Sequence, residues 1–138
     1  MVGIVVLSHG SLAEGLCSAA ELIFGGREQC DSLGLFEGED FALFTERVRG
    51  EIERLDRGDG VLVLVDLYGA SPYNAVAKLL PQLEEKGHSV QMLTGANLPM
   101  LLEAQTLRES RTLPQLTQAL LSTAREAIQA PIQNGRIV

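Results

Sequence analysis

The fold of this chain is decided by the stretch Val61-Leu62-Val63-Leu64-Val65-Asp66-Leu67-Tyr68-Gly69-Ala70-Ser71-Pro72-Tyr73-Asn74. Its first five residues are all branched and apolar, which is typical of a strand buried on both faces. Asp66 ends this run, and small residues follow. A serine cap at Ser71 with proline at the first helical position then predicts the start of a helix.

A second stretch of the same design lies at the beginning of the chain. It reads Val2-Gly3-Ile4-Val5-Val6-Leu7-Ser8-His9-Gly10, an apolar and β-branched run that also predicts a buried strand. A histidine stands where this strand should end. One strand end therefore offers an imidazole, and the other offers a carboxylate.

The remaining elements alternate between helix and strand. A weak period-two pattern predicts a short outer strand at 30–36, and residues 90–94 are expected to form a fourth short strand. Helical spacing predicts helices at 12–24, 41–55, 72–86, 98–107 and from about 114 onward. Asp40 and Asn97 stand where caps are expected. The expected apolar stripes are Leu12, Leu16, Ala19, Ala20 and Ile23; Phe41, Phe44, Val48, Ile52 and Leu55; Val76, Leu79, Leu80 and Leu83; and Leu116, Leu120, Leu121 and Ile128.

This alternation predicts a doubly wound α/β fold. We expect a mainly parallel four-stranded sheet of order 2-1-3-4, with right-handed crossovers and helices on both faces. Residues 1–129 would form one domain, and residues 130–138 a C-terminal tail or edge strand that could contact a second subunit. In such a sheet, ligand chemistry lies where the chain changes direction between strands one and three. His9 and Asp66 stand at those two strand ends.

This pairing would suit phosphoryl chemistry. One imidazole nitrogen can attack or accept a phosphoryl group while the other donates a hydrogen bond to a carboxylate. The helix that follows Asp66 adds a partial positive charge at its start. The small residues expected to offer backbone N–H groups to an anion are Gly10, Gly69, Ala70 and Ser71.

Simpler interpretations exist for each of these residues. A histidine after a strand is commonly a turn or core residue, and an aspartate at a strand end is often only a cap. Capping alone explains Ser71. His88 lies in a polar turn without an apparent carboxylate partner, so we expect a solvent-facing loop residue. Cys17 and Cys30 have no metal-site spacing and are expected in the core.

Composition excludes several classes of function. The chain has 138 residues and a net charge of −7, which disfavours nucleic-acid or anionic-membrane binding and suits either a basic partner or simple solubility. It has no basic leader and no apolar run long enough to span a membrane, so we expect a cytoplasmic protein. No P-loop, dinucleotide fingerprint or nucleophile elbow is present. We therefore expect no cofactor and no metal.

At these residues the chain resembles the IIA components of the mannose-type bacterial sugar phosphotransferase system. The resemblance spans nearly the whole chain and is specific when three blocks are taken together. They are Gly3 to Gly10 with Leu12-Ala13-Glu14-Gly15-Leu16, then Val65 to Ala75, and then Thr94-Gly95-Ala96-Asn97-Leu98-Pro99-Met100-Leu101.

The resemblance implies a cytoplasmic, homodimeric phosphocarrier with a mainly parallel α/β sheet. The family histidine matches His9; it accepts a phosphoryl group from phospho-HPr and passes it to a IIB component, here expected to be a separate chain. The paired aspartate matches Asp66, and the serine near the phosphate matches Ser71. Two departures are Leu67, where some members have a hydroxyl residue, and Ala70, which replaces a glycine.

Two alternatives remain at this point. The phosphotransferase subunit of the dihydroxyacetone kinase system has a similar domain and histidine, although its turn usually lacks the Gly-Xaa-Ser-Pro helix start. A non-catalytic module that senses a small anion at the same crevice is the other. Phospho-HPr separates the sensor from the carriers, because a sensor would form no covalent adduct.

Overall fold

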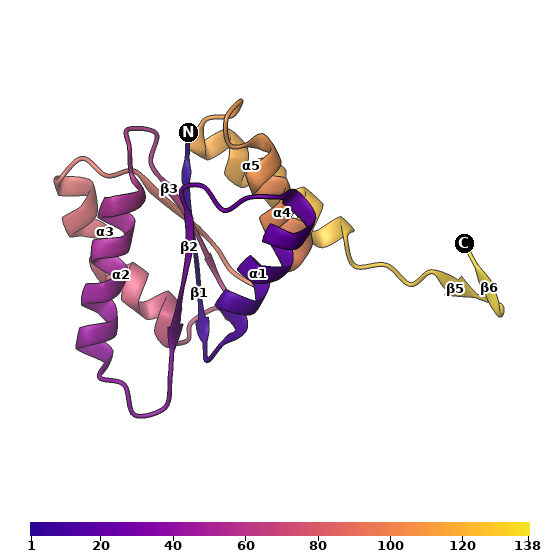
Figure 1. The fold of residues 1–138 in the computed structure, drawn as a ribbon, viewed down its shortest axis with the longest axis horizontal. Helices are drawn as coiled ribbons and strands as arrows, with labels where there is room; N and C mark the ends of the chain where they lie inside the picture. The colour runs from indigo at the N-terminus through magenta and orange to yellow at the C-terminus, as the bar shows by residue number, and fades with distance from the viewer.

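A computed structural model describes all residues 1–138 as a parallel sheet between two helical layers (Figure 1). The sheet has the order β2-β1-β3-β4, and every neighbouring pair is parallel, which confirms the predicted fold class. The strands are β1 (Gly3–His9), β2 (Cys30–Leu35), β3 (Val61–Val65) and β4 (Val90–Leu93). The helices are α1 (Leu12–Phe24), α2 (Phe41–Leu55), α3 (Ser71–Glu85), α4 (Leu98–Leu107) and α5 (Leu113–Glu126).

The two central strands are buried on both faces. All five residues of β3 and the first six of β1 are buried, as expected for apolar runs without alternation. Their register pairs Gly3 with Val61 and Leu7 with Val65. This register brings the carboxyl ends of β1 and β3 to the same edge of the sheet.

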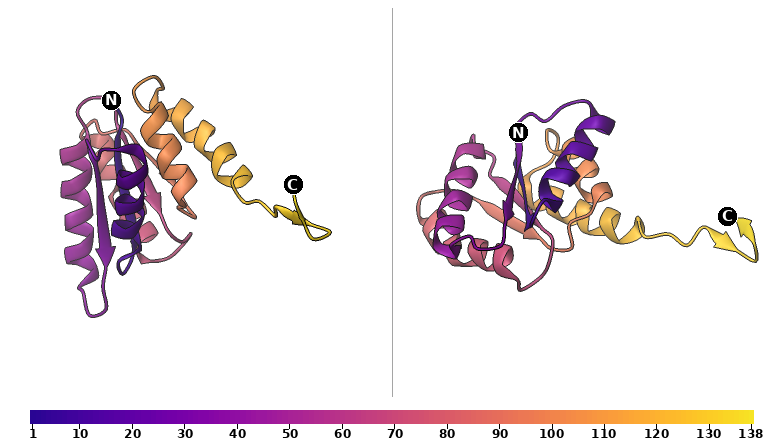
Figure 2. Two further views of the ribbon diagram at one scale, coloured as in Figure 1. Left: turned by 45° about the vertical axis from the view of Figure 1, so that its right-hand side comes forward. Right: turned by 60° about the horizontal axis from the view of Figure 1, so that its bottom comes forward.

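The sheet separates two apolar cores. Helices α1, α4 and α5 cover one face, and α2 and α3 cover the other (Figures 1 and 2). Alternation along β1 divides its side chains, so Ile4 and Val6 enter the first core while Val5 and Leu7 enter the second. Cys17 and Cys30 both lie in the first core, which confirms their predicted place.

The apolar stripe predicted for α1 is partly wrong. Leu12 and Ile23 are 49% and 61% exposed, whereas the buried residues of the helix are Ala13, Cys17 and Ala20. Small side chains on this face let α1 lie close to the sheet. The buried face of α1 is therefore rotated away from the face that its large apolar residues predicted.

Two predicted caps are confirmed and one is wrong. Asp40 accepts hydrogen bonds from the N–H groups of Ala42 and Leu43, and Asn97 accepts one from Met100 N–H. Ser71, in contrast, is the first residue of α3 and not its cap. Ala70 takes the cap position in an extended conformation without a side-chain hydrogen bond, so proline stands at the second helical position.

The C-terminal segment leaves the body of the molecule. Ile128, expected in the last apolar stripe, lies beyond the end of α5 and is 81% exposed, so this prediction is wrong. The tail then forms a short antiparallel hairpin of β5 (Ile132–Gln133) and β6 (Arg136–Ile137), which projects away from the sheet and helices (Figures 1 and 2). Positive φ angles at Asn134 and Gly135 match the turn that an Asn-Gly pair favours.

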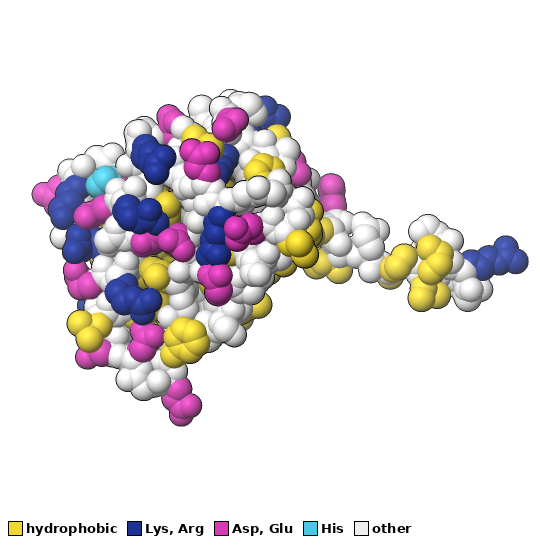
Figure 3. Space-filling view, viewed as in Figure 1, with side chains coloured by type: hydrophobic (Ala, Val, Ile, Leu, Met, Phe, Trp, Pro, Cys, Tyr) yellow, Lys and Arg dark blue, Asp and Glu magenta, His cyan; other side chains and the backbone are white.

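Charged side chains of both signs are interspersed over the body in Figure 3. On α2, for example, Arg49 forms ion pairs with Glu46 and Glu53. The negative net charge is therefore not gathered into one patch on this face. No helix has both the length and the apolar character that a membrane span requires.

Candidate functional site

His9 and Asp66 lie in contact at the carboxyl edge of the sheet. The Nδ1 atom of His9 lies 2.7 Å from Asp66 Oδ2, and the backbone N–H of His9 donates to the same oxygen at 2.9 Å. One carboxylate oxygen therefore holds both the ring and the backbone of the histidine. The meeting that sheet topology predicted for these two strand ends is present.

The sheet itself brings the pair together. His9 is the last residue of β1, and Asp66 follows the last residue of β3 directly. Asp66 N–H donates to Leu7 O at 3.1 Å, which extends the ladder between the two strands by one residue. The carboxylate is thus fixed by backbone pairing as well as by its own hydrogen bonds.

Burial differs between the two side chains. The Asp66 side chain is 12% exposed, whereas that of His9 is 49% exposed. An ionised carboxylate can only accept, so against it the hydrogen of the bond lies on Nδ1, and in the neutral ring Nε2 then has a free lone pair. The carboxylate is thus largely covered, whereas the imidazole ring beside it is half-exposed to solvent.

Asp66 also has one oxygen without a partner. Its Oδ1 atom is buried and makes no hydrogen bond within the chain. A buried carboxylate oxygen of this kind loses its hydration without compensation, so it favours the approach of a donor or of positive charge. This adds to the negative potential behind the His9 ring.

The loop after Asp66 leads from the carboxylate to the start of α3. Gly69 has φ +78°, and its carbonyl accepts a hydrogen bond from the Asn74 side chain at 3.2 Å. The N–H groups of Gly69 and Ser71 have no backbone partner, whereas Ala70 N–H donates weakly to Leu67 O at 3.5 Å. Two free donors and the amino end of a 15-residue helix therefore lie in the loop that follows the carboxylate.

The turn after His9 is held differently. Gly10 has φ +55°, and its N–H donates to Leu35 O at 2.8 Å. The backbone donor of Gly10 is therefore engaged in the structure, unlike those of Gly69 and Ser71. The turn packs directly against Gly34. A Cβ atom at position 34 would lie 2.1 Å from the carbonyl oxygen of Gly10, so a larger residue there would clash with the turn.

Two tyrosines, Tyr68 and Tyr73, follow Asp66 in the chain, and the sequence did not predict a role for them. Tyr68 is 73% exposed, and its ring centroid lies 4.9 Å from that of Tyr73 at an interplanar angle of 49°. The Tyr68 hydroxyl raises the pKa of Tyr73. With Leu67, which is 58% exposed, these rings give the loop an apolar and aromatic outer surface.

His88 is not the unpartnered loop residue that the sequence suggested. Its Nδ1 atom lies 2.8 Å from Oδ2 of Asp56, whose side chain is 7% exposed. Asp56 Oδ1 accepts two further hydrogen bonds, from the N–H groups of Gly58 and Gly60. Burial raises the pKa of Asp56, but the hydrogen bonds from His88 and the two glycines together bring it below its usual value.

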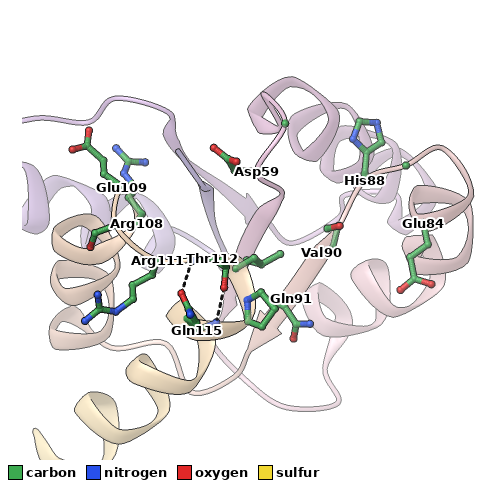
Figure 4. Close-up of a pocket in the computed structure, with 16 residues that line it drawn as sticks. Asp59, Glu84, His88, Val90, Gln91, Arg108, Glu109, Arg111, Thr112 and Gln115 are labelled. Carbon is green, nitrogen blue, oxygen red and sulfur yellow. Dashed lines mark hydrogen bonds between the residues drawn. The ribbon is translucent and has the colours of Figure 1, made fainter.

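A large cavity lies away from His9, at the amino ends of β3 and β4 (Figure 4). Its volume is about 820 Å³, and only two of its sixteen lining residues are hydrophobic. Arg111 and Gln115 line one side of it and His88 another, as Figure 4 shows. Small-molecule sites are mostly apolar, so this polar hollow is not a stronger candidate than the His9 edge. No three His, Cys, Asp or Glu side chains cluster as a metal site would require.

Comparison with known proteins identifies the family. Residues 3–121 match the model of the EIIA-man family, described as PTS system fructose IIA component. The chain belongs to this family. The match includes both strand ends that carry His9 and Asp66, so the EIIA-man fold and the candidate site coincide in one region.

Individual EIIA-man relatives agree with this assignment. The chain is 31% identical over 130 residues to the mannose-specific EIIAB component of Escherichia coli, covering 94% of this chain but only 39% of that protein. It is 29% identical to the fructose-specific EIIA component of Bacillus subtilis, covering 94% and 86% of the two chains. A crystal structure of a phosphotransferase system EIIA component from Streptococcus agalactiae superposes with a TM-score of 0.85 at 27% identity, covering 94% of this chain and 97% of that one.

Proposed function

We propose that this IIA component is a phosphohistidine carrier and that His9 accepts the phosphoryl group on Nε2. The observation that carries the proposal is the 2.7 Å contact between His9 Nδ1 and Asp66. Because that contact occupies one ring nitrogen, the other is left as the nucleophile. The half-exposed ring can meet a partner protein, while the carboxylate remains largely covered.

The proposed reaction is a direct exchange between two histidines. The Nε2 lone pair of His9 attacks the phosphorus of phospho-HPr, and the P–N bond to the HPr histidine breaks as the new P–N bond forms. Positive charge develops on the His9 ring during the attack, and Asp66 stabilises it. In the second step the same bond on His9 breaks, and the phosphoryl group passes to a IIB component.

The loop after Asp66 would receive the phosphoryl oxygens. The free N–H groups of Gly69 and Ser71 and the start of α3 support this role. Ala70 would add a small side chain beside them, and the Ser71 hydroxyl a further donor. Gly10 would serve by leaving space beside the ring, since its N–H is bonded to Leu35 O.

Labelling by phospho-HPr tests the function. The wild-type protein should take up phosphate that is lost in acid and kept in base, as expected for a phosphoramidate. His9→Ala should remain unlabelled. His88→Ala is the matched control, because His88 also has an aspartate at Nδ1, and it should label like the wild type. Binding of phospho-HPr without a covalent adduct, or labelling of His9→Ala elsewhere, would contradict the assignment.

A homodimer that uses the tail is the proposed assembly. Ile132, Ile137 and Val138 are 66%, 76% and 73% exposed on a hairpin that projects from the body (Figure 1). Apolar side chains presented in this way gain little in a monomer and would be buried against a second subunit. Sedimentation of the chain without residues 130–138 tests this. An unchanged dimer would remove the tail from the interface.

The location follows from the proposed partners. A carrier that takes phosphate from HPr and delivers it to a IIB component would work in the cytoplasm. The sugars in the printed names of the relatives, mannose and fructose, belong to those proteins. A IIA component would not itself contact the sugar.

A further inference from the structure

Ser8, the residue before His9, is fully buried and makes two hydrogen bonds. Its Oγ accepts the N–H of Ala13 at 2.7 Å, and its hydroxyl hydrogen donates to the carbonyl of His9 at 3.0 Å. Ala13 is the second residue of α1. One hydroxyl therefore connects the histidine backbone to the first turn of the following helix.

This connection replaces a missing helix cap. The N-cap residue of α1, Ser11, makes no side-chain hydrogen bond, so it does not satisfy the N–H groups of the first turn. Ser8 performs this task from three residues earlier, across the turn that contains His9 and Gly10. The start of α1 and the position of His9 are consequently coupled through one side chain.

The backbone of His9 is thus held on both sides. Asp66 Oδ2 accepts its N–H at 2.9 Å, and Ser8 binds its carbonyl at 3.0 Å. The alternation of β1 allows this, because Ser8 lies on the face toward α1 while His9 lies on the opposite one. Loss of the hydroxyl would leave the Ala13 N–H without a partner in a buried position and free the His9 carbonyl.

We infer that Ser8 is a positioning residue for phosphoryl transfer, which fixes the His9 backbone so that Nδ1 stays on Asp66 and Nε2 faces the donor. The inference rests on the proposed function, since it assigns Ser8 a part in the reaction at His9. Ser8 does not touch the transferred group. It acts through the His9 carbonyl and the first turn of α1.

The test compares Ser8→Ala, which removes the hydroxyl, with Ser8→Thr, which keeps it. Single-turnover transfer from phospho-HPr should slow roughly ten- to a hundredfold in Ser8→Ala, because small misplacements of a reacting group have effects of this order. Its KM for phospho-HPr should be unchanged, since the partner surface is intact. Ser8→Thr should be faster than Ser8→Ala.

Thr117→Val is the matched control. Thr117 is also buried, and its hydroxyl donates to Leu113 O at 2.8 Å within α5, away from His9. This variant should keep the wild-type transfer rate. A rate loss in Thr117→Val equal to that in Ser8→Ala would mean that general destabilisation is the cause, and the inference would be overturned.

Nuclear magnetic resonance of the His9 ring tests the positioning of His9 independently of phosphoryl transfer. The Nδ1–H proton bonded to Asp66 should exchange slowly in the wild type and quickly in Ser8→Ala. Unchanged ring signals and an unchanged rate would refute the positioning role, and an unfolded Ser8→Ala would show that the hydroxyl serves the fold instead. If the wild type takes no label, the proposed function fails, while the ring signals still decide whether Ser8 fixes His9.

Discussion

Replacing Asp66 by asparagine should slow phosphoryl transfer while keeping the fold. The carboxylate makes two hydrogen bonds through Oδ2, to the ring and to the backbone of His9. A hydrogen bond to a charged group contributes about 1.5–3 kcal/mol, against about 1 kcal/mol between neutral groups. Neutralising the acceptor should therefore cost about 0.5–2 kcal/mol per bond.

Only the ring bond strengthens in the transition state, so the rate loss is about 0.5–2 kcal/mol, or roughly a twofold to thirtyfold lower rate. The loss falls on the transition state because positive charge develops on the ring as Nε2 attacks. Rapid-quench measurement of transfer from phospho-HPr gives the two rates, and circular dichroism verifies that both proteins are folded. Asp56→Asn, which alters the carboxylate paired with His88, should stay within about twofold of the wild type. Equal rates for Asp66→Asn and the wild type would leave Asp66 as a structural end to β3.

Three further predictions concern stability. Asp56→Asn should lower the free energy of unfolding at pH 7 by about 1–3 kcal/mol. Because the folded-state pKa of Asp56 is lowered, this stabilisation is complete above the unfolded pKa and should be lost as the pH falls below about 4; a constant difference in urea titrations from pH 7 to 2 would contradict it. Asn97→Ala should destabilise the protein by about 0.5–2 kcal/mol through loss of the cap on α4, measured by thermal unfolding, and no change would mean that the cap is redundant. Phe44→Ala, at a fully buried side chain of the second core, should cost about 3–5 kcal/mol in urea, and a loss below about 1 kcal/mol would imply that the core closes around the cavity.

The sheet could be predicted because its signals are local. The uninterrupted apolar runs of β1 and β3 mark strands buried on both faces, and the alternation of elements then determines a parallel order. The site followed from that order, since His9 and Asp66 stand at the ends of adjacent strands. Asp40 and Asn97 were recognisable because a cap acts within three residues.

The errors arose where packing or distant partners decide the outcome. In α1 the large apolar residues Leu12 and Ile23 are exposed, and small residues form the buried face instead. Small side chains are needed there because they allow the helix to approach the sheet closely. The contact between His88 and Asp56 joins residues 32 positions apart, so no local pattern indicates it. Likewise, nothing in the sequence distinguishes the Ser8 hydroxyl from that of any other serine in the chain.

The His9–Asp66 contact has a consequence for the order of folding, because it joins residues 57 positions apart. A chain that has formed only β1, α1 and β2 already contains the histidine but lacks its carboxylate. Pairing of β3 against β1 requires α2 to have crossed the sheet, a non-local step that is slow relative to helix formation. During refolding, protection of the His9 ring proton should therefore follow the appearance of helical structure and coincide with pairing of the central strands.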